Sequence, residues 1–200
     1  MISLAGQSLK NCFTDIRLLG TYLLVLLLSF SITPCLSSAQ EVRVVKESQV
    51  KTAFIYNFSK FTTWPERSFQ DLPQNTFTVC MVGNEPLSST LRQLSKSKTI
   101  KDRTILFQDN PPKSELKNCR ILYIGSSESS RLGKILKNIE GQPVLTIGNT
   151  RGYAKRGVGI NLFKQDGRLR FEINHSAVIK SGLTLSSELL ALGVLVEGEK

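Results

Sequence analysis

The sequence predicts an α/β protein, a three-layer sandwich in which a mainly parallel sheet lies between helices and carries an antiparallel C-terminal hairpin. Short apolar runs that suit buried strands alternate along the chain with segments whose apolar residues recur every three or four positions, as helices require. Asp166-Gly167 separates two runs of strand type, which is a strong signal for a tight hairpin.

The first helix is predicted over residues 51–65. The apolar residues that recur there at spacings of four, four and three are Val50, Phe54, Phe58 and Phe61. Such spacing places side chains on one face, so these four are expected to form the core stripe of the helix. Pro65 cannot continue a helix and disfavours helical backbone at Trp64, so the helix is expected to stop there.

The later elements follow from the same two periodicities and from glycines at their ends. Gly83 is expected to end the first strand, and Gly141 to end the helix that precedes the fourth strand. The predicted strands are residues 77–82, 104–107, 120–124, 143–147, 158–163 and 168–174. The predicted helices are residues 86–94, 127–139, 175–180 and 186–196, the last of them capped by Ser186.

The last predicted strand has one core face and one solvent face. Its apolar side chains are Leu169, Phe171 and Ile173, and they alternate with Arg168, Arg170 and Glu172. Alternate residues of a strand point to opposite faces, so the two arginines and the glutamate are expected to face water.

The first 39 residues are predicted to be an export signal. Lys10 and Arg17 give it a basic start, and an apolar run rich in leucine follows. Small residues at the −3 and −1 positions place the cleavage between Ala39 and Gln40. The mature protein is then residues 40–200, a length typical of one domain, and it is expected in the periplasm.

A retained membrane anchor is one alternative to a cleaved signal. The apolar run is shorter than the roughly 20 residues that a transmembrane helix needs, and it ends at Pro34. A lipoprotein acylated at Cys35 is the other alternative, although a proline precedes that cysteine. No segment after residue 40 is long or apolar enough to cross a bilayer, so no transmembrane segment is expected in the mature chain.

The chain is strongly basic, with a formal net charge of +10. The predicted mature part keeps a charge near +9, because the signal carries Lys10 and Arg17 against Asp15. This charge favours acidic protein partners or anionic membrane surfaces. An exported protein rarely meets nucleic acid, so no nucleic-acid partner is expected. The alternative is a solvated surface that only keeps the protein dissolved.

Removing the predicted signal removes two of the four cysteines, Cys12 and Cys35. Cys80 and Cys119 remain, each in or beside a predicted core strand. An even number of cysteines in an oxidising compartment indicates one disulfide, and two buried free thiols are the alternative.

The sequence carries no recognisable catalytic, cofactor or metal motif. The glycine-rich loop at residues 148–159 lacks the Gly-Lys-Ser/Thr ending of a phosphate-binding loop, and it lacks G-x-G-x-x-G between a strand and a helix. His175 is the only histidine, which rules out paired histidine ligands, and Cys80 and Cys119 are too far apart for a C-x-x-C site. No enzyme activity and no cofactor are expected.

The remaining class of function is the binding of another molecule. The candidate binding residues for an acidic surface or a small anion are Arg151, Lys155, Arg156, Arg168, Arg170, Glu172 and His175. Ordinary solvated side chains, with His175 as a surface or capping residue, are the alternative interpretation.

Taken in order, several segments resemble the YfiR family of small periplasmic proteins of Gram-negative bacteria. The first is KTAFIYNFSKFTTWP at residues 51–65, with its Asn-Phe, Lys-Phe and Trp-Pro pairs. The others are the cysteine strand ending in glycine at 79–83, the strand opened by cysteine at 119–124, Pro-Val-Leu-Thr at 143–146, Gly-x-Gly-Ile at 157–160, Phe-x-Ile-Asn at 171–174 and Gly-Leu-x-x-Ser-x-x-Leu-Leu at 182–190. The resemblance covers essentially the whole predicted mature chain.

This resemblance implies a non-catalytic regulator whose partner is the periplasmic sensor domain of an inner-membrane diguanylate cyclase, which it keeps inactive. It also implies that an intact disulfide keeps the repressor folded, and it suggests a homodimer. YfiR carries a second cysteine pair that this chain lacks, so redox control here must depend on Cys80 and Cys119. The rival interpretations are a small-ligand-binding or envelope-assembly accessory protein on the same fold and, more distantly, a periplasmic hydrolase.

Overall fold

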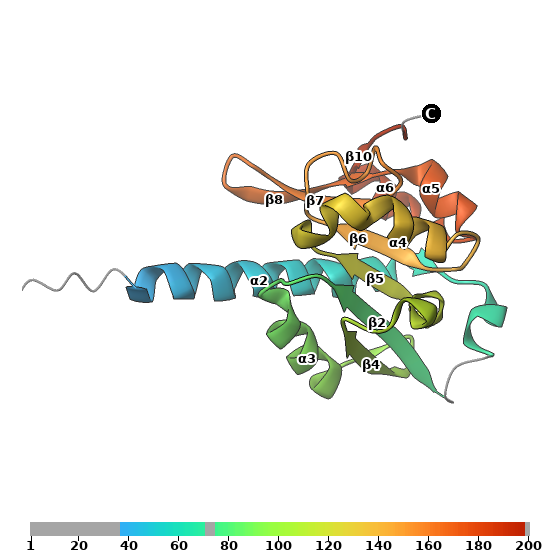
Figure 1. Ribbon diagram of the computed structural model, residues 1–200, viewed down its shortest axis with the longest axis horizontal. Coiled ribbons are helices and arrows are strands. Elements are labelled where there is room, and N and C mark those ends of the chain that lie inside the picture. The colour runs from blue at the N-terminus through green and yellow to red at the C-terminus, as the bar shows by residue number, and fades with distance from the viewer. Residues whose placement is uncertain (1–36, 71–74, 199–200) are drawn as a thin grey trace, which may run out of the picture. The chain divides into compact units, whose positions relative to one another are not determined.

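A computed structural model describes residues 37–70 and 75–198, and the described residues from Arg43 onward belong to one compact unit (Figure 1). The helical segments are α2 Ser37–Lys60, η1 Glu66–Phe69, α3 Leu87–Ser97, η2 Lys113–Asn118, η3 Ser126–Arg131, α4 Leu132–Asn138, α5 His175–Lys180 and α6 Ser187–Leu192, where η marks 3₁₀ helices. The strands are β1 Thr62–Thr63, β2 Thr76–Val82, β3 Thr99–Ile100, β4 Arg103–Asp109, β5 Ile121–Ile124, β6 Leu145–Gly148, β7 Ile160–Gln165, β8 Arg168–Ile173, β9 Thr184–Leu185 and β10 Val194–Leu195.

Eight strands form one mixed sheet in the order β10-β8-β7-β6-β5-β2-β4-β3. The run from β4 to β7 is parallel throughout, and β10 is parallel to β8. The hairpin β7–β8 and the short pair β3–β4 are antiparallel. The predicted fold class is therefore confirmed, but the hairpin is not the edge of the sheet, because β10 lies outside it.

The sheet separates two hydrophobic clusters, which makes the protein three layers deep. Along β2, Phe77, Val79 and Met81 belong to one cluster, and the alternate residues Cys80 and Val82 belong to the other. Helices α2, α3, α5 and α6 supply the first cluster, whereas η2 and α4 supply the second. Figure 1 shows α4 on the side of the sheet opposite to α2. Because alternate residues of the central strands point to opposite faces, their side chains pack against the helices on both sides of the sheet.

The predicted apolar stripe of the first helix is only partly correct. Phe58 is buried and Phe54 is half-buried, but Val50 is 41% exposed and Phe61 is 39% exposed. The buried face of α2 is instead formed by Ile55, Phe58 and small hydroxyl residues, which are Ser48, Thr52 and Ser59. The Thr52 hydroxyl lies 2.7 Å from that of Thr90 in α3, so short side chains allow the two helices to approach closely.

The first helix also ends earlier than predicted, at Lys60 and not at Pro65. The Thr62 hydroxyl donates to the Phe58 carbonyl at 2.7 Å, which satisfies one of the free carbonyls at the helix end. Residues Thr62–Thr63 then pair antiparallel with Thr184–Leu185 as a separate two-stranded sheet that periodicity did not reveal. Each partner is only two residues long, too short to show a repeat.

Two other helix predictions need correction. Residues 126–131 form a 3₁₀ segment before α4, where one helix was expected over residues 127–139. The closing helix stops at Leu192, and residues 194–195 leave it to become β10. Its predicted cap is confirmed, because the Ser186 hydroxyl accepts from the backbone N–H of Leu189 at 3.3 Å.

The hairpin is formed as predicted. Asp166 and Gly167 both have positive φ, at 51° and 72°, as a tight turn with two left-handed residues requires. In β8 the Phe171 and Ile173 side chains are buried, Arg168 and Arg170 are exposed, and Glu172 is half-buried.

The predicted signal lies outside the described residues, except for residues 37–39 at the start of α2. The proposed cleavage site between Ala39 and Gln40 falls inside that helix and stays a prediction. None of the helices that the structure describes combines the length and the apolar character needed to span a bilayer.

Candidate functional site

Open α/β sheets bind ligands where the strand order reverses, which in this protein is between the carboxyl ends of β2 and β5. Glu85 lies at this position, in the loop that follows β2. Its Oε1 accepts hydrogen bonds from the backbone N–H of Ser126 at 3.0 Å and from the Ser126 hydroxyl at 3.1 Å. A Cβ at Gly125 would lie 2.7 Å from Cγ of Glu85, and one at Gly83 would lie 2.7 Å from Oγ of Ser127. The Glu85 side chain therefore bridges the loops that follow β2 and β5, and it also lines a small hollow of about 230 Å³.

The glycine-rich loop after β6 is organised around Tyr153, which is fully buried. The Tyr153 hydroxyl donates to the carbonyl of Gly125 at 3.1 Å. A Cβ at Gly148 would lie 2.5 Å from the Tyr153 ring, so only glycine fits there. The ring accounts for this glycine without a bound phosphate.

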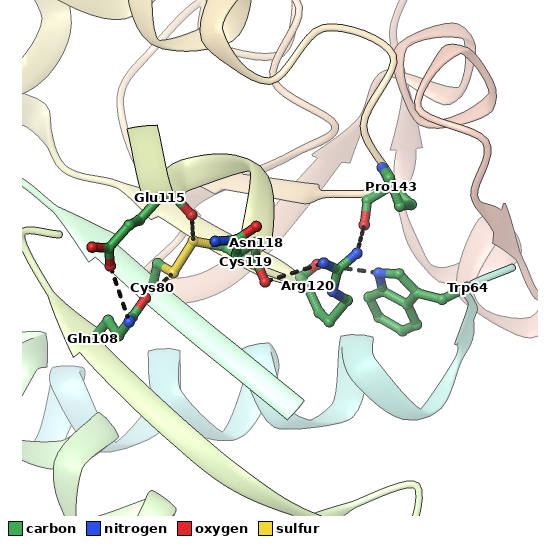
Figure 2. Close-up of a disulfide and its surroundings, with 8 residues drawn as sticks. All are labelled: Trp64, Cys80, Gln108, Glu115, Asn118, Cys119, Arg120 and Pro143. Atoms are coloured by element: carbon green, nitrogen blue, oxygen red, sulfur yellow. Dashed lines mark hydrogen bonds between the residues drawn. A yellow bond between two sulfur atoms is a disulfide. The ribbon is translucent and has the colours of Figure 1, made fainter. Parts of the chain in front are cut away.

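Cys80 of β2 and Cys119, just before β5, form the disulfide that their number had indicated (Figure 2). Their Cα atoms are 5.8 Å apart and both residues are fully buried. Oε1 of Gln108 lies 3.5 Å from Sγ of Cys80, and the carbonyl oxygen of Glu115 lies 3.8 Å from Sγ of Cys119. A disulfide sulfur has no proton to donate, so these are packing contacts. The bond joins β2 to the segment between η2 and β5, on the face of the sheet that packs against α4.

Arg120 follows the disulfide and is 4% exposed, which is unusual for a cation. Its guanidinium donates to the carbonyl oxygen of Asn118 at 3.1 Å and to that of Pro143 at 3.5 Å (Figure 2). The Arg120 carbonyl accepts from Nε1 of Trp64 at 3.2 Å. The peptide after Cys119 thus contacts both the loop before β6 and the segment after α2.

A basic depression opens on another part of the surface, with a volume of about 920 Å³. Its cationic lining residues are Lys137, Lys155, Arg156 and Lys180, against the one carboxylate of Glu140. Charges of one sign around a hollow strengthen the local potential, so this depression attracts anionic groups.

The candidate binding residues are divided over several places. Lys155 and Arg156 line the basic depression, and His175 lines an adjoining hollow of about 650 Å³ that shares Lys180 with it. Arg156 is held there by a 3.1 Å hydrogen bond from Nη2 to the Ser129 carbonyl oxygen. His175 opens α5, but the helix cap is Asn174, whose Oδ1 accepts from Ala177 N–H.

Arg151 and Glu172 line a third hollow, of about 550 Å³, beside Glu47 of α2. Glu47 forms salt bridges to Lys51, at 3.0 Å, and to Lys164 of β7. Burial opposes the ionisation of Glu47, but hydrogen bonds from the two lysines outweigh it and hold its pKa below the usual 4.5. Glu172 accepts from Nδ2 of Asn161 at 3.2 Å.

Arg168 and Arg170 line none of these three hollows. Lys137 and Lys180 do line the basic depression, and they were not among the predicted residues. They come from α4 and from the end of α5, so their nearness to the loop at residues 155–156 depends on the tertiary packing of three separate segments. No local motif in the sequence marks them.

The described part of the chain offers no evident catalytic or metal group. It contains no cluster of three or more His, Cys, Asp and Glu side chains that would hold a metal ion. Burial, with smaller contributions from Glu85 and Glu47, raises the pKa of Tyr123 far above its usual value, so this phenol stays protonated.

A family model described as YfiR/HmsC-like matches residues 48–194, well over half of the chain. The chain belongs to the YfiR/HmsC-like family. The match runs from α2 to the first residue of β10 and so includes the disulfide and most of the basic depression. YfiR-like proteins are periplasmic and regulatory, and they act on diguanylate cyclases. The resemblance found in the sequence is confirmed.

A search of curated proteins found none that matches this YfiR/HmsC-like chain. Among solved structures, a conserved domain protein from Vibrio cholerae O1 biovar El Tor is 13% identical with a TM-score of 0.47. An ABC domain in complex with L-Trp from Streptococcus pneumonia is 10% identical with a TM-score of 0.49. Each match covers 74% of this chain, and 59% and 60% of those two chains. With TM-scores below one half, neither carries an argument about this protein.

Proposed function

We propose that this protein is a non-catalytic periplasmic regulator that binds the periplasmic sensor domain of an inner-membrane diguanylate cyclase and represses it. Membership in the YfiR/HmsC-like family is the observation that carries this proposal, because its match spans residues 48–194. The predicted signal peptide, cleaved between Ala39 and Gln40, would deliver the chain to the compartment where such a sensor domain lies.

The features of the fold suit a binding protein. At the strand-order reversal Glu85 accepts hydrogen bonds from Ser126, and a wider hollow of about 920 Å³ opens elsewhere on the surface. On that surface, basic side chains outnumber acidic ones around the depression lined by Lys155 and Arg156, which favours an acidic partner.

We further propose that repression requires the disulfide. Cys80 and Cys119 are buried, and the adjoining Arg120 contacts both Trp64 and the loop before β6. Reduction would therefore loosen the Arg120 contacts with the Trp64 segment and with the loop before β6, as well as the link between β2 and the start of β5. Redox control would depend on this pair, which is the only cysteine pair outside the predicted signal.

A small-ligand-binding or envelope-assembly accessory protein is the second candidate. The open basic depression of about 920 Å³ favours it, since this volume is within the range of small-molecule sites. Homodimerisation, suggested by the family, stays a prediction as well.

Deletion of the gene and measurement of cyclic di-GMP tests the main proposal. Levels should rise in the deletion strain and return when the wild-type chain is restored. A strain restored with the double variant Cys80→Ala/Cys119→Ala should stay partly derepressed. Unchanged cyclic di-GMP after deletion, in cells shown to express the protein, would refute repression of a cyclase. Recovery of the restored chain from the periplasmic fraction tests its location.

A further inference from the structure

Among the described residues the sheet ends at β10, whose two residues are apolar and about half exposed. Successive residues of a strand point to opposite faces, yet Val194 is 47% exposed and Leu195 is 59% exposed. The described residues therefore cover each face of this strand only in part. Ile179 of α5 and Leu192 of α6 are exposed as well.

The backbone of this edge is also available for pairing. β10 lies at the end of the strand order, with β8 on its inner side. The backbone N–H of Val196 donates inward to the carbonyl of Ile173 at 2.9 Å. Since successive residues direct their N–H and C=O groups to alternate sides, those of Leu195 point away from β8. Proteins usually protect such an edge with lysine or proline, and the residues at positions 194–196 are Val, Leu and Val.

The surroundings of the edge are basic. Leu195 lines the hollow of about 650 Å³ together with His175 and Lys180, and Glu197 is its one carboxylate. Lys180 also lines the basic depression, which adds Lys155 and Arg156. Together the two hollows carry four cations, Lys137, Lys155, Arg156 and Lys180, against the carboxylates of Glu140 and Glu197, so an occupant that spans both meets an excess of positive charge. A second copy of this chain would bring the same positive surface, so charge disfavours self-association at this edge.

We propose that β10 is the docking edge for the cyclase, and that an extended acidic segment of the cyclase's periplasmic domain adds to the sheet as a strand beside Leu195. This inference rests on the proposed function and specifies its interface. Main-chain hydrogen bonds to Leu195 would supply affinity, apolar contacts would cover Val194 and Leu195, and acidic side chains would reach Lys180 and the basic depression.

Two variants test separately how the backbone of β10 and the positive charge beside it contribute to docking of the cyclase. Leu195→Pro removes an N–H that faces the free edge and leaves the inward bond from Val196 in place. Lys180→Glu reverses an exposed charge at the hollow. The matched controls are Leu106→Lys, on β4 near the opposite edge and 40% exposed, and Lys98→Glu, which is exposed beyond α3. Thermal denaturation of each purified variant establishes that it folds.

The test restores the deletion strain with each full-length variant and measures cyclic di-GMP. Leu195→Pro and Lys180→Glu should fail to lower it, whereas both controls should repress like the wild type. If deletion itself leaves cyclic di-GMP unchanged, the proposed function fails and this inference falls with it. If deletion raises cyclic di-GMP but folded Leu195→Pro and Lys180→Glu repress fully, the docking edge alone is refuted.

A photo-crosslinking amino acid at position 195, with position 106 as control, gives a second measurement in the same cells. The expected result is a covalent adduct to the cyclase from position 195 and none from position 106. An adduct with the mass of two copies of this chain from position 195 would overturn the proposal in favour of a homodimer. Absence of any adduct from position 195, in cells where repression is intact, would also overturn it.

Discussion

Removal of the disulfide is the perturbation whose size the structure defines best. The double variant Cys80→Ala/Cys119→Ala removes the bond without placing a hydroxyl in the core. Both cysteines are fully buried, and the bond closes a loop with a sequence separation of 39. In the chain-entropy model, opening a loop of this length lowers the free energy of unfolding by about 4 kcal/mol at 25 °C.

Removal of the disulfide should also lower the melting temperature and change the m-value, which is the slope of the free energy of unfolding against urea concentration. For a domain of this size, about 4 kcal/mol corresponds to a decrease in Tm of roughly 8–16 °C. The unfolded chain expands when the cross-link is absent, so the urea m-value should increase while the midpoint decreases. A decreased midpoint with an unchanged m-value would instead indicate lost packing in the native state.

Urea denaturation followed by tryptophan fluorescence is the appropriate assay, because Trp64 is the only tryptophan and is buried against Arg120. Wild-type protein with reductant serves as the control, since it breaks the bond without changing the sequence. Reduced wild type and the double variant should unfold at similar urea concentrations, both well below oxidised wild type. Equal midpoints for oxidised and reduced wild type would refute the reasoning and show that the bond does not stabilise the fold.

Three further predictions concern single side chains. Glu47→Gln should lower the free energy of unfolding at neutral pH. The difference from the wild type should disappear as the pH falls from the usual 4.5 through the lowered pKa of Glu47, because the wild-type carboxylate is then protonated and no longer pairs with Lys51 and Lys164. Urea midpoints that differ equally at every pH would contradict this prediction. Asn174→Ala should cost about 2–3 kcal/mol in urea denaturation, because its side chain caps α5 and also donates to a buried carbonyl. Ser186→Ala should lower the free energy of unfolding by only about 1 kcal/mol in the same assay, because it removes a single capping hydrogen bond. If Ser186→Ala destabilised the protein as much as Asn174→Ala does, the bond assigned to Asn174 beyond its cap would not contribute.

Local patterns predicted much of the fold. The strand at 168–173 and its turn at Asp166-Gly167 were predicted within a residue, because alternation and left-handed turn residues are properties of neighbours in the chain. The predicted stripe of the first helix was less successful, since Val50 and Phe61 are exposed while Thr52 is buried. Close approach of α2 to α3 favours small hydroxyl residues, and hydrophobicity does not signal such a contact.

Sequence patterns did not predict the two-residue strands β1, β9 and β10. β10 was assigned to the closing helix, and the pair formed by Thr62–Thr63 and Thr184–Leu185 was missed. Two residues cannot display a period, and their hydrogen-bond partners lie far away in the chain. The basic depression was partly predicted through Lys155 and Arg156, but Lys137 and Lys180 join it only through packing of α4 and α5.

The sequence by itself determined the fold class, the family, the order of the main elements and the identity of the two cysteines that form the bond. The fold class, the family and the order of the elements follow from short-range periodicity, turn residues and an ordered set of motifs, whereas the cysteine pair follows from the number of cysteines left after the predicted signal. Tertiary structure alone decided that Glu85 bridges the loops after β2 and β5, that four cations surround one depression, and that Leu195 lies at the last strand of the described sheet. These features join residues that are distant in the chain, and only the packing of sheet and helices brings them together.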